Sequence, residues 1–266
     1  MNEARRDLPS RVLMEIRPGA DLRPATDLAA SLARSFGSRV KGIFVEDANL
    51  LQLADLAVAL EINVISRQLQ SLDAKALPAE VARSLAAARR ELAQLGRQLQ
   101  CEVELQVERR SPALPDMDVQ SNDIVLFSTP LEWDFDPASP AWLAVARAMA
   151  IAIPGTRIPP QGGAVMAVLG TELSTRRTRN LVERIAAAEQ AELKVSVSDD
   201  PLSALLDLIG WSSTRPSASP RLIIGEAVLL ADPSARRLRS MIGRPGCPVL
   251  LINPEASISD KEPRSA

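Results

Sequence analysis

The sequence predicts an α/β fold of two tandem doubly wound units with mainly parallel sheets, the second unit shortened. The order strand, turn, helix, strand opens the chain at residues 11–45 and returns at residues 164–197. Between these copies, residues 154–163 hold three prolines and three glycines and almost no side chain that a core could bury. We therefore expect a first unit, a linker, a second unit and a disordered tail, at residues 1–153, 154–163, 164–254 and 255–266.

The opening β-α-β unit is predicted from local patterns. Residues 11–16 are a short apolar run that ends at a Pro-Gly pair, which indicates a strand followed by a turn. Residues 22–36 carry apolar side chains every three or four positions, as a helix with one buried face does, and Gly37 follows as a helix stop. Residues 40–45 form the next strand. The connection is too long for a hairpin and fits a parallel crossover.

The rest of the first unit contains one ambiguous segment and three clear ones. Residues 49–72 are rich in leucine and are predicted to be helical, either lying over their own sheet or forming a partner or dimer surface. Residues 78–99 have the spacing of an amphipathic helix. Strict alternation at residues 102–108 predicts a strand near a sheet edge, and residues 123–127 predict a buried strand.

Residues 131–140 are predicted to be a loop, and residues 142–149 a short helix. The loop gathers carboxylates whose spacing matches no calcium-binding loop, so we expect a solvated acidic loop and no metal site: Glu132, Asp134 and Asp136. Aromatic side chains are rare in this chain, and three of them cluster here: Trp133, Phe135 and Trp142. They are expected to plug against a neighbouring domain or to contact a partner.

The second unit is predicted to repeat this order without the long helix of the first. Its predicted strands are residues 164–169, 194–197, 221–224 and 249–252. Its predicted helices are residues 174–190, 201–209 and 233–242, with a turn at Gly170 and Thr171 and a polar loop at residues 212–220.

Composition excludes several functional classes. Lysine plus arginine number 31 and aspartate plus glutamate 33, a formal net charge of -2, so no field draws in nucleic acid or an anionic membrane. The chain has no histidine, which removes Ser-His-Asp triads, Cys-His pairs and imidazole metal ligands.

No segment reaches the roughly 18 to 20 apolar residues of a membrane helix, and the N-terminus lacks the apolar run of a signal peptide. Two cysteines, Cys101 and Cys247, cannot form a disulfide framework and are expected to be buried thiols. A cytoplasmic protein is expected.

Several segments resemble the universal stress protein family, whose fold is adenine-nucleotide-alpha-hydrolase-like. The openings of both units, residues 11–45 and 165–197, are similar to the opening of that family. GIFVEDANLLQLADL at residues 42–56 is similar to the second strand and following helix of tandem bacterial members, and GCPVLLI at residues 246–252 resembles the closing strand. The resemblance implies that the closing strands of the two units lie side by side, as in the dimers of the family.

The resemblance also implies where a nucleotide would bind. Members that bind ATP use an aspartate at the end of the first strand, then a G-x-x-G loop and a Gly-Ser/Thr after the fourth strand, where backbone N–H groups approach the phosphates. Here the aspartate position is matched by Arg17 in the first unit and Leu169 in the second. The loop after the fourth strand is STPL at residues 128–131 in the first unit, without glycine.

In the second unit that loop is Gly225-Glu226-Ala227-Val228, in which the second glycine is replaced by valine and Glu226 would repel a phosphate. We expect no bound cofactor, with ATP as the alternative, and vestigial pocket candidates at Arg17, Gly170, Thr171 and Gly225.

These patterns predict a non-enzymatic regulatory or scaffolding protein of the universal-stress-protein type, which binds a protein partner or itself, for instance as a homodimer. One alternative is a sensor that binds ATP or another small anionic nucleotide in the second unit. Another is an unrecognised hydrolase, although no base or metal set is identifiable. We expect no nucleic-acid partner and no membrane insertion.

Overall fold

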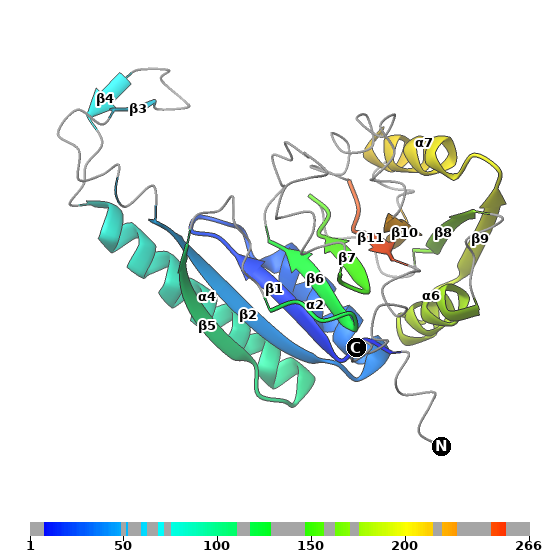
Figure 1. Ribbon diagram of the computed structural model, residues 1–266, viewed down its shortest axis with the longest axis horizontal. Helices are drawn as coiled ribbons and strands as arrows, with labels where there is room; N and C mark the ends of the chain where they lie inside the picture. The colour runs from blue at the N-terminus through cyan, green and yellow to red at the C-terminus, as the bar shows by residue number, and fades with distance from the viewer. Residues whose placement is uncertain are drawn as a thin grey trace, which may run out of the picture.

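The computed structural model describes residues 8–48, 52, 60–62, 69–71, 76–110, 118–128, 147–156, 163–170, 176–214, 220–227 and 246–253. These residues build one nine-stranded sheet (Figure 1). In spatial order its strands are β5 (Glu104–Arg110), β2 (Arg39–Asp47), β1 (Arg11–Ile16), β6 (Asp123–Phe127), β7 (Ala150–Ile153), β11 (Val249–Ile252), β10 (Leu222–Glu226), β8 (Val165–Gly170) and β9 (Leu193–Ser198). Neighbouring strands are parallel except at β7 and β11, which are antiparallel.

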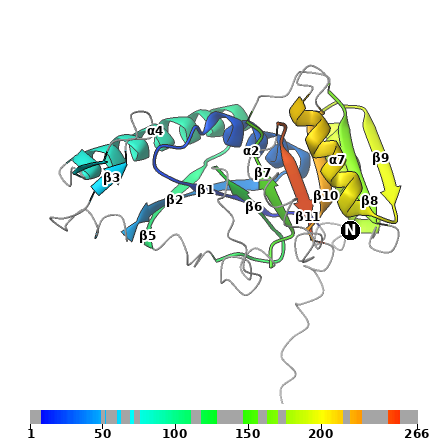
Figure 2. The same ribbon diagram turned by 90° about the horizontal axis from the view of Figure 1, so that it is seen from above.

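Four helices cover this sheet in the described part of the chain: α2 (Arg23–Phe36), α4 (Ala76–Leu99), α6 (Arg176–Ala188) and α7 (Pro201–Thr214). Buried side chains of α2, α4 and α6 join one hydrophobic cluster, and those of α7 join the cluster on the other face. Figure 2 shows α2 and α4 lying over the same face of the sheet. No helix among the described residues is long and apolar enough to cross a membrane.

Helix α2 illustrates how the sequence sets these elements. Proline in its first turn suits the start of a helix, because the missing N–H has no partner there anyway. Gly37 ends the helix with φ 68° in the left-handed region, and its N–H donates to the carbonyl of Ala33 at 2.8 Å. The buried face, which includes Leu28 and Leu32, then packs on the sheet and against α6.

Residues 1–153 and 164–254 meet where β7 pairs with β11. The strand expected to close the first unit, residues 123–127, is β6, and β7 lies between it and β11. One hydrophobic cluster includes residues from both, among them Leu32 on α2 and Ile185 on α6. Glu189, just beyond α6, is paired with Arg221 and lies 3.9 Å from Arg34 of α2. The boundaries of the units themselves stay a prediction.

Most predicted elements are confirmed, and four predictions are wrong in part. Residues 147–149 are not helical, and β7 follows where no strand was expected. Within the leucine-rich segment 49–72, β3 (Leu60–Ile62) and β4 (Leu69–Ser71) form an antiparallel pair in place of a helix. Residues 212–214, expected in a loop, continue α7. Cys101 is exposed, whereas Cys247 is buried as expected.

Several predictions lie outside the described residues. These are the tail at 255–266, the loop at 131–140, the helix at 233–242, Thr171, most of the linker at 154–163 and most of the segment at 49–72, so whether that segment is core or interface stays open.

Candidate functional site

The carboxyl ends of β1 and β6 form the first place where the resemblance puts a ligand. Arg17 follows β1, and its Nε donates to Glu15 Oε1 at 2.9 Å. The Glu15 side chain is 5% exposed and the Arg17 side chain 35%, so the carboxylate is shielded from water while the guanidinium stays partly exposed. The backbone N–H of Arg17 donates to Ser128 Oγ at 3.4 Å, which joins the ends of the two strands. The position expected to hold a nucleotide-binding aspartate therefore carries a guanidinium that is committed to a neighbouring carboxylate.

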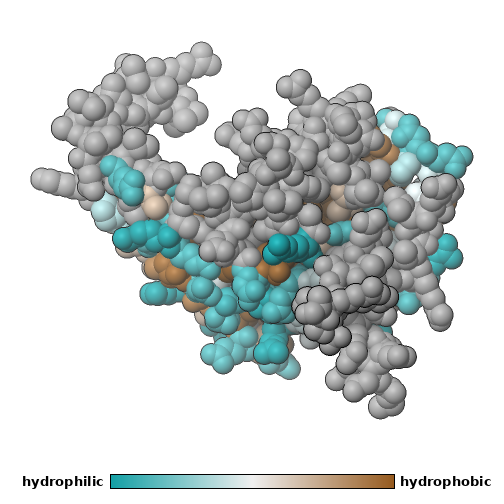
Figure 3. Space-filling view, viewed as in Figure 1, coloured by the Kyte–Doolittle hydropathy of each residue, from teal (hydrophilic) through white to brown (hydrophobic). Residues whose placement is uncertain are grey.

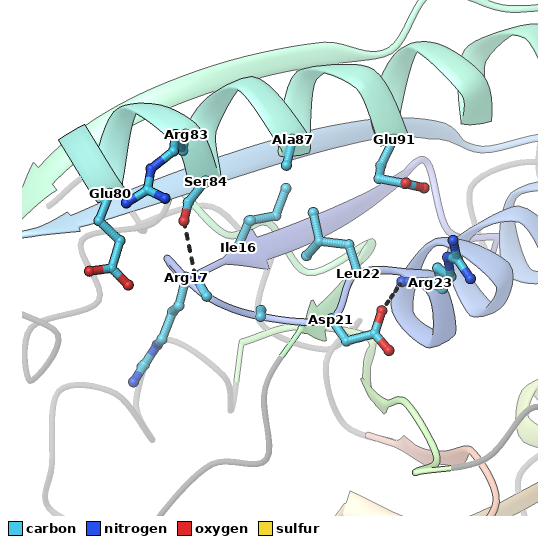
Figure 4. Close-up of a pocket in the computed structure, with 12 residues that line it drawn as sticks. Ile16, Arg17, Asp21, Leu22, Arg23, Glu80, Arg83, Ser84, Ala87 and Glu91 are labelled. Atoms are coloured by element: carbon cyan, nitrogen blue, oxygen red, sulfur yellow. Dashed lines mark hydrogen bonds between the residues drawn. The ribbon is translucent and has the colours of Figure 1, made fainter. Parts of the chain in front are cut away.

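A cavity of about 430 Å³ opens beside Arg17, between the β1–α2 loop and α4 (Figure 4). Its apolar part is made by Ile16, Leu22 and Ala87, and charged groups of both signs surround it: Arg17, Asp21, Arg23, Glu80, Arg83 and Glu91. Figure 4 shows the Arg17 side chain extending away from α4. The Gly19 N–H donates to Ser84 Oγ at 3.3 Å, which ties the loop to the helix.

In the second unit, the residues equivalent to Arg17 and Ser128 lie one position later in the sequence than expected. The register pairs Ile224 with Ala167, and beyond it the N–H of Gly170 donates to Glu226 Oε2 at 3.4 Å. In the first unit the backbone N–H of Arg17 donates in the same way to the side chain of Ser128. Gly170, rather than Leu169, is therefore the counterpart of Arg17.

Gly225 lies in a strand, and not in the loop where the sequence pattern placed it. It lies within β10, and a Cβ at this position would come within 2.8 Å of Leu205 Cδ2 on α7 and 3.4 Å of Leu251 Cδ2 on β11. The absence of a side chain therefore lets α7 pack on the sheet. The strand also extends through Glu226, so the loop begins later than the sequence pattern indicated.

Glu226 is fully buried between the ends of β8 and β10, a location that the sequence did not reveal. Its Oε1 has no hydrogen-bond partner among the described residues, and its Oε2 accepts from Gly170. Burial raises the pKa of Glu226, and the hydrogen bond from Gly170 opposes that effect only in part. The sequence pattern placed Glu226 in a loop, whereas its carboxyl lies inside the fold at the end of β10.

Replacing Glu226 by glutamine is expected to stabilise the protein increasingly as the pH rises. The folded state binds a proton more tightly than the unfolded state, whose glutamate has a pKa of about 4.3. Wild-type stability therefore falls as the pH rises from that value through the raised folded pKa, while glutamine stays neutral throughout. Thermal unfolding of both proteins between acid and mildly alkaline pH measures the difference, with Glu183→Gln on the exposed face of α6 as control. A stability difference that does not change with pH would contradict the raised pKa of the buried Glu226 carboxyl.

The residues that α4 contributes to the cavity beside Arg17 were not predicted from the sequence. Ser84, Arg83 and Glu80 lie on one side of that helix, and no sequence motif marks them. The amphipathic pattern places these three residues on the polar side of the helix, which indicates that they lie outside the core. The pattern does not indicate that the β1–α2 loop faces them. Within the described ranges, no group of histidine, cysteine, aspartate and glutamate could hold a metal ion.

Comparison with known proteins gives similarity in structure alone. No family model matches the chain, and no curated protein does. A protein assigned to the universal stress proteins in Pseudomonas aeruginosa UCBPP-PA14 superposes with a TM-score of 0.50 and 11% identity, over 94% of this chain and 95% of that one. A universal stress protein from Archaeoglobus fulgidus DSM 4304 gives a TM-score of 0.52 and 9% identity, over 93% and 97% of the two chains.

A functionally unknown protein from Pseudomonas aeruginosa PAO1 gives a TM-score of 0.51 and 12% identity, over 98% of this chain and 100% of that one. The similarity thus extends over nearly the whole length of each protein, and includes both halves of the nine-stranded sheet. Identities this low support an inference about the fold and not about a ligand. This chain has the α/β fold of the universal stress proteins.

Proposed function

We propose that this chain is a non-enzymatic regulatory or scaffolding protein of the universal-stress-protein type that acts in the cytoplasm through protein–protein contacts. The observation that carries the proposal is the place of Gly225 inside β10, packed against Leu205. The glycine that survives from the family's phosphate-binding pattern is thereby used for packing between α7 and the sheet. It gives no backbone N–H in a loop that could approach a phosphate.

The first unit supports the same proposal. The resemblance implies an aspartate at the end of β1, and Arg17 stands there in an ion pair with Glu15. An arginine cannot accept the hydrogen bond that a carboxylate would accept from a nucleotide. The chain would therefore have the fold of the family without binding a nucleotide, and it would act through contacts that its surface makes with a protein.

Thermal unfolding with and without millimolar ATP, ADP and cyclic dinucleotides, with Mg²⁺ present, tests the proposal. We expect the same melting temperature in every case. A ligand at a hundred times its dissociation constant would add about 2.7 kcal/mol, which corresponds to roughly 5 to 10 °C for a chain of this size. A shift of that order with any nucleotide would refute the proposal.

A sensor of a small anion is the second candidate, and the cavity beside Arg17 favours it. Arg23 and Arg83 line that cavity, and their guanidinium groups suit phosphate or carboxylate, whereas the Arg17 guanidinium is paired with Glu15. Three carboxylates line it as well, which lowers its attraction for an anion. If a nucleotide does raise the melting temperature, Arg23→Ala and Arg83→Ala should reduce the shift for a ligand bound there and leave it unchanged for a ligand bound in the second unit.

A further inference from the structure

The cavity between the β1–α2 loop and α4 has the size and the lining of a small-molecule site. Its volume is about 430 Å³, within the range of about 300–1,000 Å³ that ligand pockets occupy. Ile16 and Leu22 line it from the loop side and are buried, and Ala87 of α4 lies across from them (Figure 4). The hydrogen bond from the Gly19 N–H to Ser84 Oγ holds the loop against α4. The cavity is therefore bounded by two elements that are tied to each other.

Three of the charged side chains around the cavity already have a partner within the chain. The Arg17 guanidinium is paired with Glu15. Arg83 Nε donates at 3.3 Å to the carbonyl one turn earlier on α4. Asp21 Oδ1 accepts from the backbone N–H of Arg23 at 3.2 Å, at the start of α2. These three groups therefore have less capacity left for a ligand than the remaining charges.

The Arg23 guanidinium and the Glu91 carboxylate are the charges of opposite sign that stay unpaired at one end of the cavity. Neither has a hydrogen-bond or ion-pair partner among the residues that the structure describes. Arg23 lies in the first turn of α2 and Glu91 on α4. Figure 4 shows both side chains toward the same end of the cavity, with Glu80 and Arg83 at the other end. Glu91 is half-buried and Arg23 is exposed, so a ligand can reach both groups from solvent.

Opposite charges on neighbouring elements of this half do pair directly where no cavity lies between them. Glu46 of β2 and Arg109 of β5 are 3.1 Å apart. Figure 3 shows hydrophilic side chains interleaved with hydrophobic ones where these two strands lie. Arg23 and Glu91 line one cavity without pairing, so a ligand that carries a negative and a positive group can pair with both of them at once.

We propose that this cavity binds a free α-amino acid with an apolar side chain. Arg23 binds the carboxylate of the ligand and Glu91 binds its ammonium group. The apolar side chain of the ligand lies against Ile16 and Leu22. A simple anion would meet the like charge of Glu91, and a simple cation would meet that of Arg23, so a zwitterion is the ligand that both residues favour. The inference goes beyond the proposed function, which requires no ligand.

Isothermal titration calorimetry of the full chain with L-leucine tests the proposal. Two analogues of leucine each lack one charge: isocaproate has no amino group, and isoamylamine has no carboxylate. We expect leucine to bind and each analogue to bind at least about tenfold more weakly, because each leaves one charged side chain of the cavity without a partner. Absence of leucine binding at millimolar concentration, or equal binding of either analogue, would overturn the proposal.

Variants of the two charged residues give a second measurement, in which each variant has its own analogue. Glu91→Gln should weaken the binding of leucine at least about tenfold and should not weaken that of isocaproate. Arg23→Gln should weaken leucine by a similar factor and should not weaken isoamylamine. Arg90→Gln is the matched control, since Arg90 is exposed on the same helix and does not line the cavity, and it should bind leucine as wild type does. Unchanged leucine binding in Glu91→Gln or in Arg23→Gln would refute the assigned roles.

Discussion

Replacing Asp123 by alanine is expected to lower the free energy of unfolding by about 3–5 kcal/mol. The Asp123 side chain is fully buried at the start of β6 and accepts from Arg11 Nε at 2.9 Å and from Arg11 Nη2 at 2.7 Å. It also accepts from the N–H of Gln120 at 2.7 Å. The variant leaves the Gln120 N–H without its acceptor and the partly buried Arg11 guanidinium without its counter-charge, although Arg11 Nη2 still donates to the Asp118 carbonyl at 3.0 Å. Urea unfolding followed by circular dichroism measures the loss.

Arg109→Ala is the matched control for Asp123. It also breaks an ion pair between two strands, with Glu46 at 3.1 Å, but Arg109 is 68% exposed. Water replaces the partner of an exposed charge at little cost, so we expect a loss of no more than about 1 kcal/mol. Equal losses in the two variants would contradict the view that burial decides the value of the Arg11–Asp123 pair.

Sequence patterns predicted the strands that carry Arg11 and Asp123, but not the ion pair between them. Both strands were predicted at their observed starts from apolar runs, because runs of this kind are typical of buried parallel strands. The ion pair was not predicted, since its partners are 112 residues apart and only the parallel register brings them together. The hydrogen bond to Asp123 raises the pKa of Arg11, although burial of the guanidinium opposes this.

The wrong helix at residues 147–149 and the missed strand β7 have a common cause. The stretch from residue 141 to 153 is apolar almost throughout, and such a stretch has no period that separates a buried strand from a buried helix. In the structure β7 lies between β6 and β11, and all four of its residues are buried, so no alternation of apolar and polar residues appears. The amphipathic helices, which bury one face only, were predicted to within two residues of each end.

The candidate site was predicted less well than the fold because a glycine in a sequence has more than one use. The pattern around Gly225 was interpreted as the remnant of a phosphate loop. The structure shows a glycine that makes room for Leu205, a residue 20 positions earlier in the chain. The packing of α7 on β10 distinguishes a glycine that makes room for a helix from a glycine in a phosphate loop. A local sequence motif holds no information about packing between elements.

Gly155→Ala is expected to destabilise the protein by about 1–3 kcal/mol or more, because the added methyl group would overlap the backbone of another segment. The new Cβ would lie 2.6 Å from the Cys247 carbonyl carbon, 2.7 Å from its Cα and 2.8 Å from Pro248 N. Gly155 was predicted as a linker residue with nothing to bury, yet it is buried where the chain leaves β7. Thermal and urea unfolding measure the effect.

Gly225→Ala is the informative comparison for Gly155→Ala. Its new Cβ would approach Leu205 Cδ2 at 2.8 Å, which is the end of a side chain that can rotate, whereas Gly155 faces backbone that enters β11. Cys247 and Pro248 precede the strand that pairs with β7, so a displacement there moves the junction of the two halves. We therefore expect the larger loss for Gly155→Ala. If Gly225→Ala were the more destabilising variant, the junction between β7 and β11 would be looser than its close backbone packing indicates.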